Sequence, residues 1–179
     1  MKVYAGVSWS GGAASVPIVL VTEAAMDGPW TFGLERPATH AFVVLQHSDG
    51  LAWRLDAGYG GLHEAVWSPF VDTAHVRIWE AGGGHDNLVQ QMAHAARGLT
   101  GQRYDGMELV AQGASVMSKL PMFARLAAAA TNADWARGMI CTKLTKTVLE
   151  AGGYKVELPD LLPERFARWC GENLAGHEA

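Results

Sequence analysis

The stretch ATHAFVVLQ at residues 38–46 decides the fold class of this chain. Phe42, Val43 and Val44 follow one another there, and such an apolar run is typical of a strand whose sheet is buried on both faces. A turn at residues 48–50 follows, and Leu51 to Ala57 then alternates larger apolar and smaller or polar side chains with the period of two that strands have. The two segments therefore predict a hairpin of antiparallel strands.

On both sides of this hairpin the apolar pattern predicts further elements, with the strands in the first half of the chain and most of the helices after it. Further strands are predicted at residues 1–7, 62–67 and 74–79. Helices are predicted at residues 15–25, after a cap at Asp86 or Asn87, after Asp105, at 124–130, at 142–150 and at 163–170. The buried face of the helix after residue 86 is expected to hold Leu88, Met92, Ala95, Ala96 and Leu99. This order indicates an α+β fold in which a helical layer covers an antiparallel sheet.

Composition describes an ordinary globular protein of one domain, spanning residues 1–179. Hydrophobic residues make up 49% of the chain and charged residues 18%, and no repeat or linker-like stretch divides it. The net charge is −4 and the basic residues are scattered, which argues against nucleic acid as a partner. Two cysteines are too few for a disulfide scaffold or a cysteine-based zinc site, so we expect a reducing compartment.

The apolar segments are short. None reaches the ~18 residues that a membrane-spanning helix needs, so no stable membrane insertion is expected. Residues 8–15 are rich in Ser, Gly and Ala where a signal peptide would have its apolar core. We therefore expect a cytoplasmic protein, and export by a non-classical route stays open. Nothing in the sequence indicates an oligomeric state.

Cys141 follows a short apolar lead-in and stands at the first turn of a predicted helix. The positive end of a helix dipole makes a thiol there easier to ionise, and the N–H groups of the first turn can hold an oxyanion. The alternative is a core residue, because free cysteines are among the most buried residue types. The second cysteine, Cys170, is expected in the core.

His40 and Asp56 are the candidate partners of Cys141. A histidine at the start of a strand can act as the base for a thiol if the sheet packs against the start of the cysteine helix. Asp56 lies on the presumed neighbouring strand, where it can accept the second ring N–H of His40. The alternatives are a histidine satisfied within the sheet and a solvated carboxylate at a strand end.

No metal or cofactor is predicted. HEAVW at residues 63–67 has Trp67 where the zinc-protease helix motif has its second metal ligand, and the glycines before it favour a strand. GGGHD at residues 82–86 lacks the Lys-Ser/Thr ending of a phosphate-binding loop. Residues 63–67 are therefore assigned to a strand, and residues 82–86 to a flexible connection before a helix.

Taken in order, these segments resemble the circularly permuted branch of the NlpC-type, papain-like cysteine hydrolases, in which the histidine strand precedes the cysteine helix. THAFVV (residues 39–44) is similar to the Ser/Thr-His strand of the family, and LDA (55–57) with its trailing hairpin is similar to the next strand. GQRYD (101–105) is similar to the Gly-x-x-Tyr-Asp that opens a family helix, and MICTKL (139–144) to the Cys-Ser-Glu nucleophile helix. PERF (163–166) looks like the closing helix, so the resemblance runs from residue 39 to the end.

The resemblance implies a permuted papain-like fold, with an antiparallel sheet packed against a helical layer that carries the cysteine. It implies that Cys141 is the nucleophile, that His40 is the general base and later the acid, and that the Cys141 N–H helps to hold the oxyanion. Asp56 would orient the imidazole, although the family usually has Glu there and has Ser-Glu where this chain has residues 142–143. Asp56 and another polar residue such as His63 both stay open for the orienting role.

By this resemblance the protein is expected to be an enzyme, a thiol amidase or peptidase that works through an acyl-enzyme. Its substrates would be small amides, peptides or esters, including peptidoglycan peptides, and it would need no cofactor. Two alternatives stay open. One is a lipid-type thiol acyltransferase on the same fold, and the other is a binding or assembly module in which Cys141 is inert.

Overall fold

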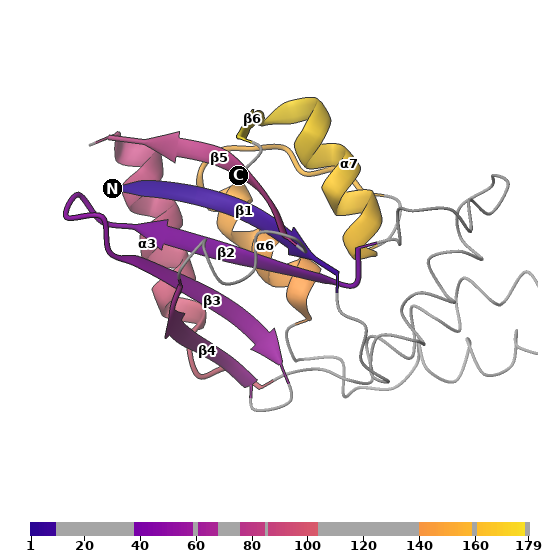
Figure 1. Ribbon diagram of the computed structural model, residues 1–179, viewed down its shortest axis with the longest axis horizontal. Helices are drawn as coiled ribbons and strands as arrows, with labels where there is room; N and C mark the ends of the chain where they lie inside the picture. The colour runs from indigo at the N-terminus through magenta and orange to yellow at the C-terminus, as the bar shows by residue number, and fades with distance from the viewer. Residues whose placement is uncertain are drawn as a thin grey trace, which may run out of the picture.

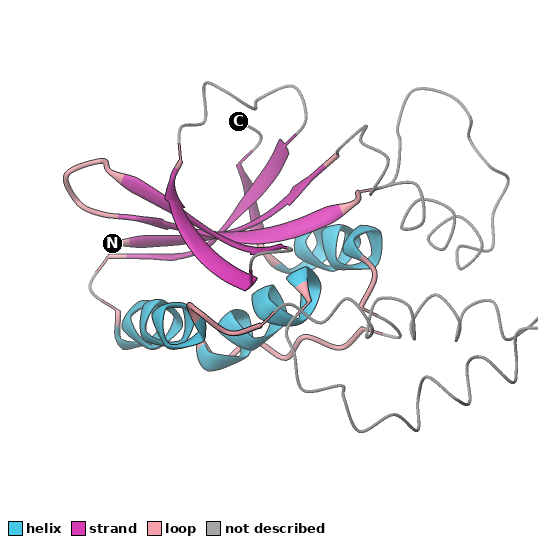
Figure 2. Cartoon of the chain, turned by 90° about the horizontal axis from the view of Figure 1, so that it is seen from below, coloured by secondary structure: helices cyan, strands magenta, loops and turns pink. Residues whose placement is uncertain are grey.

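The computed structural model describes residues 1–9, 38–58, 61–67, 76–84, 86–103, 140–158 and 161–177 (Figure 1). The described elements are β1 (Lys2–Ser8), β2 (His40–Gln46), β3 (Ala52–Gly58), β4 (Gly61–Val66), β5 (Val76–Gly83), α3 (Asn87–Leu99), α6 (Cys141–Ala151), α7 (Pro163–Asn173) and β6 (Ala175–His177). The strands form one sheet in the order β4-β3-β2-β1-β5-β6, and each neighbouring pair is antiparallel. The described helices lie against one face of the sheet (Figure 2). The α+β class predicted from the sequence is therefore confirmed.

Strands β1 to β5 correspond to the five strands that the sequence predicts, but β5 continues past the predicted end at residue 79 to Gly83. It thus takes in two glycines that were expected in a flexible connection, because the backbone of this segment pairs with β1. Strand β6 was not predicted, because a segment of three residues is too short to display an alternating pattern. It pairs with β5 at the edge of the sheet. The helices predicted at residues 15–25, after Asp105 and at 124–130 lie outside the described residues.

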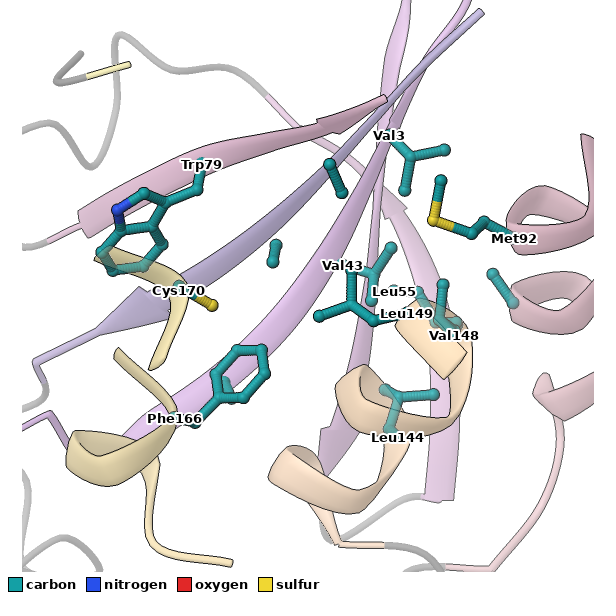
Figure 3. Close-up of a cluster of buried hydrophobic side chains, with 14 of the residues drawn as sticks. Val3, Val43, Leu55, Trp79, Met92, Leu144, Val148, Leu149, Phe166 and Cys170 are labelled. Atoms are coloured by element: carbon teal, nitrogen blue, oxygen red, sulfur yellow. The ribbon is translucent and has the colours of Figure 1, made fainter. Parts of the chain in front are cut away.

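Strand β2 is buried on both faces, as its apolar run predicts. Val43 and Leu45 belong to the main core, where they meet side chains from the helical layer (Figure 3). Phe42 and Val44 point to the opposite face and form a second apolar cluster with Ile78 of β5 and Ala52 of β3. Because these side chains of β2 are almost completely buried, the strand is an inflexible frame for the residue at its start, His40.

Helix α3 begins after Asp86, whose carboxylate accepts a hydrogen bond from the Leu88 N–H at 3.1 Å. The predicted face of this helix is wrong in part. Val89, Met92, Ala93 and Ala96 are its buried residues, whereas Leu88 is 45% exposed.

A glycine of β5 accounts for the unexpected burial of Val89, and a second glycine, at the end of α6, leaves room for Met92, whose burial was expected. A Cβ at Gly82 of β5 would lie 2.9 Å from Val89 Cγ2, and a Cβ at Gly152 would lie 2.6 Å from the Met92 side chain. The absence of side chains at these two positions leaves room for Val89 and Met92. The helical period alone does not distinguish the stripe that starts at residue 88 from the one that starts at 89.

Helix α6 ends at Ala151 with Gly152 as its C-cap, at the glycine pair where the sequence predicts its end, and Gly153 follows with a φ of +84°. Its buried face includes Cys141, Leu144, Val148 and Leu149, which pack on the sheet. Helix α7 starts at Pro163 as predicted and continues to Asn173, three residues beyond the predicted end. None of the described helices is long and apolar enough to cross a membrane.

Candidate active site

His40 is the first residue of β2, and the chain before it is fixed from two sides. The Thr39 N–H donates to the Ser8 carbonyl of β1 at 3.0 Å. The Ala38 N–H donates to Oε2 of Glu164, in the first turn of α7, at 2.9 Å. The backbone that carries the imidazole is therefore anchored to both the sheet and the helical layer.

Cys141 lies in the first turn of α6, as the sequence predicts, and is its first residue, one position before the predicted start. The residue before the helix is Ile140, which provides no side-chain cap, and the first intrahelical hydrogen bond runs from the Leu144 N–H to the Ile140 carbonyl at 2.9 Å. The N–H groups of Cys141 and Thr142 precede this bond and point out of the helix start. Positive partial charge is therefore concentrated beside the thiol.

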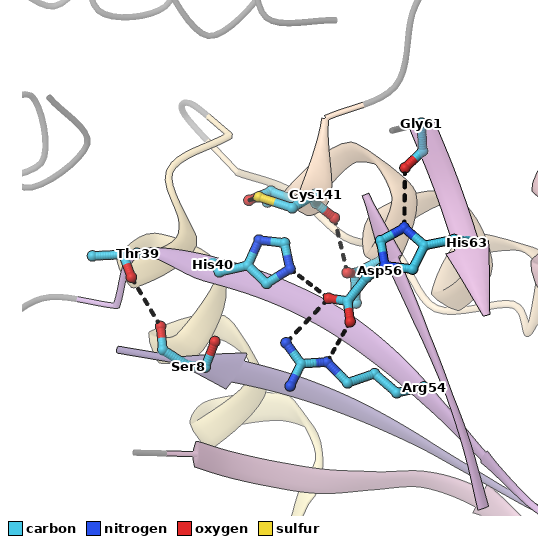
Figure 4. Close-up of polar contacts among 10 residues, drawn as sticks. Ser8, Thr39, His40, Arg54, Asp56, Gly61, His63 and Cys141 are labelled. Carbon is cyan, nitrogen blue, oxygen red and sulfur yellow. Dashed lines mark hydrogen bonds and ion pairs between the residues drawn. The ribbon is translucent and has the colours of Figure 1, made fainter. Parts of the chain in front are cut away.

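The structure brings the three candidate residues together, with the imidazole of His40 lying between Cys141 and Asp56 (Figure 4). His40 Nε2 lies 2.5 Å from Asp56 Oδ1. An ionised carboxylate only accepts hydrogen bonds, so Nε2 carries the proton and donates to Asp56. The other ring nitrogen, Nδ1, is then left for the thiol. This is the arrangement that a thiol and its base require.

The electrostatics of the site favour a thiolate paired with an imidazolium. Burial lowers the pKa of His40, but the hydrogen bond to Asp56 and the contact with Cys141 outweigh burial and raise this pKa to about 9. Burial raises the pKa of Cys141, but the His40 imidazole, the Ala41 backbone and the Thr142 hydroxyl outweigh it and lower this pKa below its usual value. The two directions agree, because each charge stabilises the other.

Asp56 is held by a residue that the sequence analysis did not single out. Arg54 Nε lies 2.6 Å from Asp56 Oδ2, and Arg54 Nη2 donates to Asp56 Oδ1 at 3.1 Å. Burial raises the pKa of Asp56, but His40 and then Arg54 outweigh burial and lower it. The signal in the sequence was the spacing: residues 54 and 56 of one strand lie on the same face.

His63 does not take the place of Asp56. It stands opposite Asp56 in the pairing of β3 with β4, but its Nδ1 faces the Gly61 carbonyl at 3.4 Å, and the residue is exposed. The HEAVW segment that contains it lies mostly in β4, so the expectation of a strand there is confirmed. Within the described ranges, no three His, Cys, Asp or Glu residues gather as ligands of a metal ion would.

The second cysteine has a different environment. Cys170 of α7 is completely buried in the main core, as the sequence predicts, and burial raises the pKa of its thiol. Cys141 is also largely buried, yet the side chain of its neighbour His40 is 25% exposed. The chain thus has two buried thiols, of which one lies beside a base and the other beside apolar groups.

Chemically, this arrangement can generate a thiolate near neutral pH, place N–H donors beside it and deliver a proton from His40. Comparison with models of protein families and with curated proteins gives no match to this chain.

Proposed function

We propose that this protein is a cysteine hydrolase that cleaves an amide or ester bond through an acyl-enzyme. The observation that carries the proposal is the position of the His40 imidazole, between the thiol at the start of α6 and the Asp56 carboxylate. A structural cysteine needs no base beside it, and the directions of both pKa shifts favour the ion pair that thiol catalysis uses.

The reaction begins when the Cys141 thiolate attacks the carbonyl carbon of the substrate. The carbonyl oxygen becomes an oxyanion, which the Cys141 N–H stabilises at the start of the helix. The C–N or C–O bond then breaks, and the His40 imidazolium gives its proton to the leaving amine or alcohol. The acyl group stays on sulfur as a thioester, and His40 is now neutral.

Neutral His40 then takes a proton from a water molecule, which attacks the thioester. The C–S bond breaks, the carboxylic acid leaves, and the thiolate and imidazolium are restored. Asp56 stays ionised throughout and holds Nε2, so that the ring presents Nδ1 to sulfur and water in turn. An amine or alcohol in place of water would give acyl transfer.

The resemblance to permuted NlpC-type hydrolases supports the same chemistry. It rests on the order of the motifs, in which the histidine strand β2 comes before the cysteine helix α6. We infer from it that the sheet and helices form a permuted papain-like fold. We also infer from it that small amides, including peptidoglycan peptides, are the class of substrate to test first.

A test uses p-nitrophenyl acetate and a panel of small amino-acid anilides with the purified full chain. The expected result is repeated turnover that Cys141→Ala abolishes and that Cys170→Ala leaves unchanged. Removal of the base in His40→Ala should lower the rate by about 10²–10⁴-fold. Cys170 provides the matched control, because it is the other buried cysteine.

Two outcomes would contradict the proposal. A single acetylation without turnover, equal in the parent and in His40→Ala, would indicate an inert module with an ordinary thiol. Transfer of the acetyl group to added glycerol or amine, with no release into water, would favour the acyltransferase. Mass spectrometry of Cys141 and of the products distinguishes these outcomes.

A further inference from the structure

We propose that Arg54 is a positioning residue of this site, which fixes the Asp56 carboxylate so that the carboxylate can hold His40. This inference rests on the proposed function and deepens it, because it adds a fourth residue that touches neither substrate nor thiol.

The contact between Arg54 and Asp56 involves both carboxylate oxygens. Nε lies 2.6 Å from Oδ2, and Nη2 donates to Oδ1 at 3.1 Å. One hydrogen bond and one close ion-pair contact, each to a different oxygen, restrain the carboxylate more than a single contact would. Oδ1 also accepts from His40 Nε2, so the orientation imposed by Arg54 is passed directly to the imidazole (Figure 4).

Arg54 is itself held in place by an aromatic ring. Its guanidinium carbon lies 3.9 Å from the centre of the Phe42 ring, a contact that suits a cation above an aromatic face. The Phe42 ring is fully buried and lies over Gly6 of β1, where any Cβ would overlap the ring. Gly6, Phe42 and Asp56 pair across β1, β2 and β3, so one row of the sheet supports the whole arrangement.

The ion pair between Arg54 and Asp56 is more buried than an ordinary surface ion pair. The side chains of Arg54 and Asp56 are only 17% and 16% exposed, so both charges lose most of their contact with water. Removing two charges from water costs free energy that their attraction largely offsets without exceeding, so stability alone does not explain this pair. One of its oxygens faces a base beside a thiol. Among the described residues, His40 of β2 contacts Asp56, His63 of β4 stands opposite it in the strand register, and Cys141 lies beyond His40.

The test compares Arg54→Lys with Arg54→Met, and takes Arg97→Met as the matched control. Lysine keeps the positive charge but loses the two-point contact, whereas methionine loses both. Arg97 is an exposed arginine of α3 that lies beside His47, away from the site. The readouts are kcat and KM for the ester, the pKa of the Asp56 carboxyl by ¹³C NMR, and the melting temperature.

The expected result is a loss of about tenfold in kcat for both Arg54 variants at unchanged KM, in line with the cost of small misplacements in active sites. The pKa of Asp56 should rise in Arg54→Met, because a nearby cation that favours the carboxylate has gone. Arg97→Met should match the parent in all readouts. Arg54→Lys also serves if Arg54→Met fails to fold, because it retains the charge on Asp56.

The inference is overturned if folded Arg54→Lys has the kcat of the parent, since charge alone would then suffice. It is also overturned if both Arg54 variants keep the kcat and the Asp56 pKa of the parent. A parent protein that shows no turnover dependent on Cys141 would instead refute the proposed function, and the role of Arg54 would be refuted with it.

Discussion

The hydrogen bond to Asp56 is the largest of the described contacts that raise the pKa of His40, and the carboxylate lies 2.5 Å from the imidazole. The same carboxylate keeps its own negative charge with the help of His40 and Arg54. A change of one atom in Asp56 is therefore enough to alter the charge of His40 while the shape of the site is retained.

The variant Asp56→Asn is expected to lower the pKa of His40 from about 9 toward its usual value. An asparagine oxygen still accepts from Nε2, but it carries no charge to stabilise the imidazolium. The measurement is a titration of the His40 ring protons by NMR in the variant and in the parent. An unchanged pKa would show that Asp56 does not control His40.

Two glycines predict opposite effects of the same substitution. Gly6→Ala should lower the free energy of unfolding by about 1–3 kcal/mol, because the new methyl group overlaps the buried Phe42 ring. Gly98→Ala in α3 should raise it by about 0.5–1 kcal/mol, because nothing lies within 4 Å and alanine is the better helix former. Urea denaturation of both variants gives the sign, and equal effects would refute this description of the packing.

At the scale of the elements, α3 is the one helix among those described whose first turn has a side-chain cap. Helix α3 has the side-chain cap of Asp86 at its first turn, and helix α6 has none. A cap on α6 would occupy N–H groups beside the thiol of Cys141, where an oxyanion has to bind. Helix α7 also starts without a side-chain cap, so the open start of α6 is compatible with an oxyanion site at Cys141 but is not particular to it.

The variant Asp86→Ala is expected to lower the free energy of unfolding by about 1 kcal/mol, the usual cost of a lost N-cap. Because α3 does not contribute to the site, the rate at which iodoacetamide alkylates Cys141 should stay that of the parent. A slower alkylation in this variant would contradict the claim that the cap of α3 affects stability but not the reactivity of Cys141. Asp86→Asn, which keeps a capping oxygen, is the matched control.

At the scale of the whole molecule, the site depends on segments that are distant in sequence. Strand β2 brings His40, β3 brings Asp56 and Arg54, and α6 brings Cys141. Glu164 of α7 joins the helical layer to the start of β2. Only the complete fold holds these groups within contact distance, so the reactivity of Cys141 reports on the fold as well as on the site.

The pH dependence of hydrolysis follows from this assembly. Activity on an amide should fall as the pH rises through about 9, because deprotonated His40 cannot protonate the leaving amine. Alkylation of Cys141 needs no such proton and should continue above this pH. The two profiles, measured on the same preparation, should therefore separate at their alkaline ends, and an amide profile that keeps rising would contradict the role of His40.

The sequence predicts the positions of the strands well, because their apolar runs and alternating side chains depend only on which faces of the sheet are buried. It also predicts the starts of α6 and α7, which a cysteine after apolar residues and a proline mark. It predicts Met92 and Ala96 on the buried face of α3 but not Val89, for which Gly82 of β5 leaves room. The role of Arg54 was missed for the same reason, since the stack on Phe42 joins two strands.

The most direct test of the central claim is the rate of iodoacetamide alkylation at Cys141 and Cys170, followed separately by mass spectrometry from pH 4 to 10. We predict that Cys141 of the parent reacts with an apparent pKa well below the ~8.5 of a free thiol, and that His40→Ala loses this advantage. Cys170 should react slowly in both proteins, because burial raises the pKa of its thiol. If Cys141 instead titrates like an ordinary thiol in both proteins, the hydrolase proposal is contradicted.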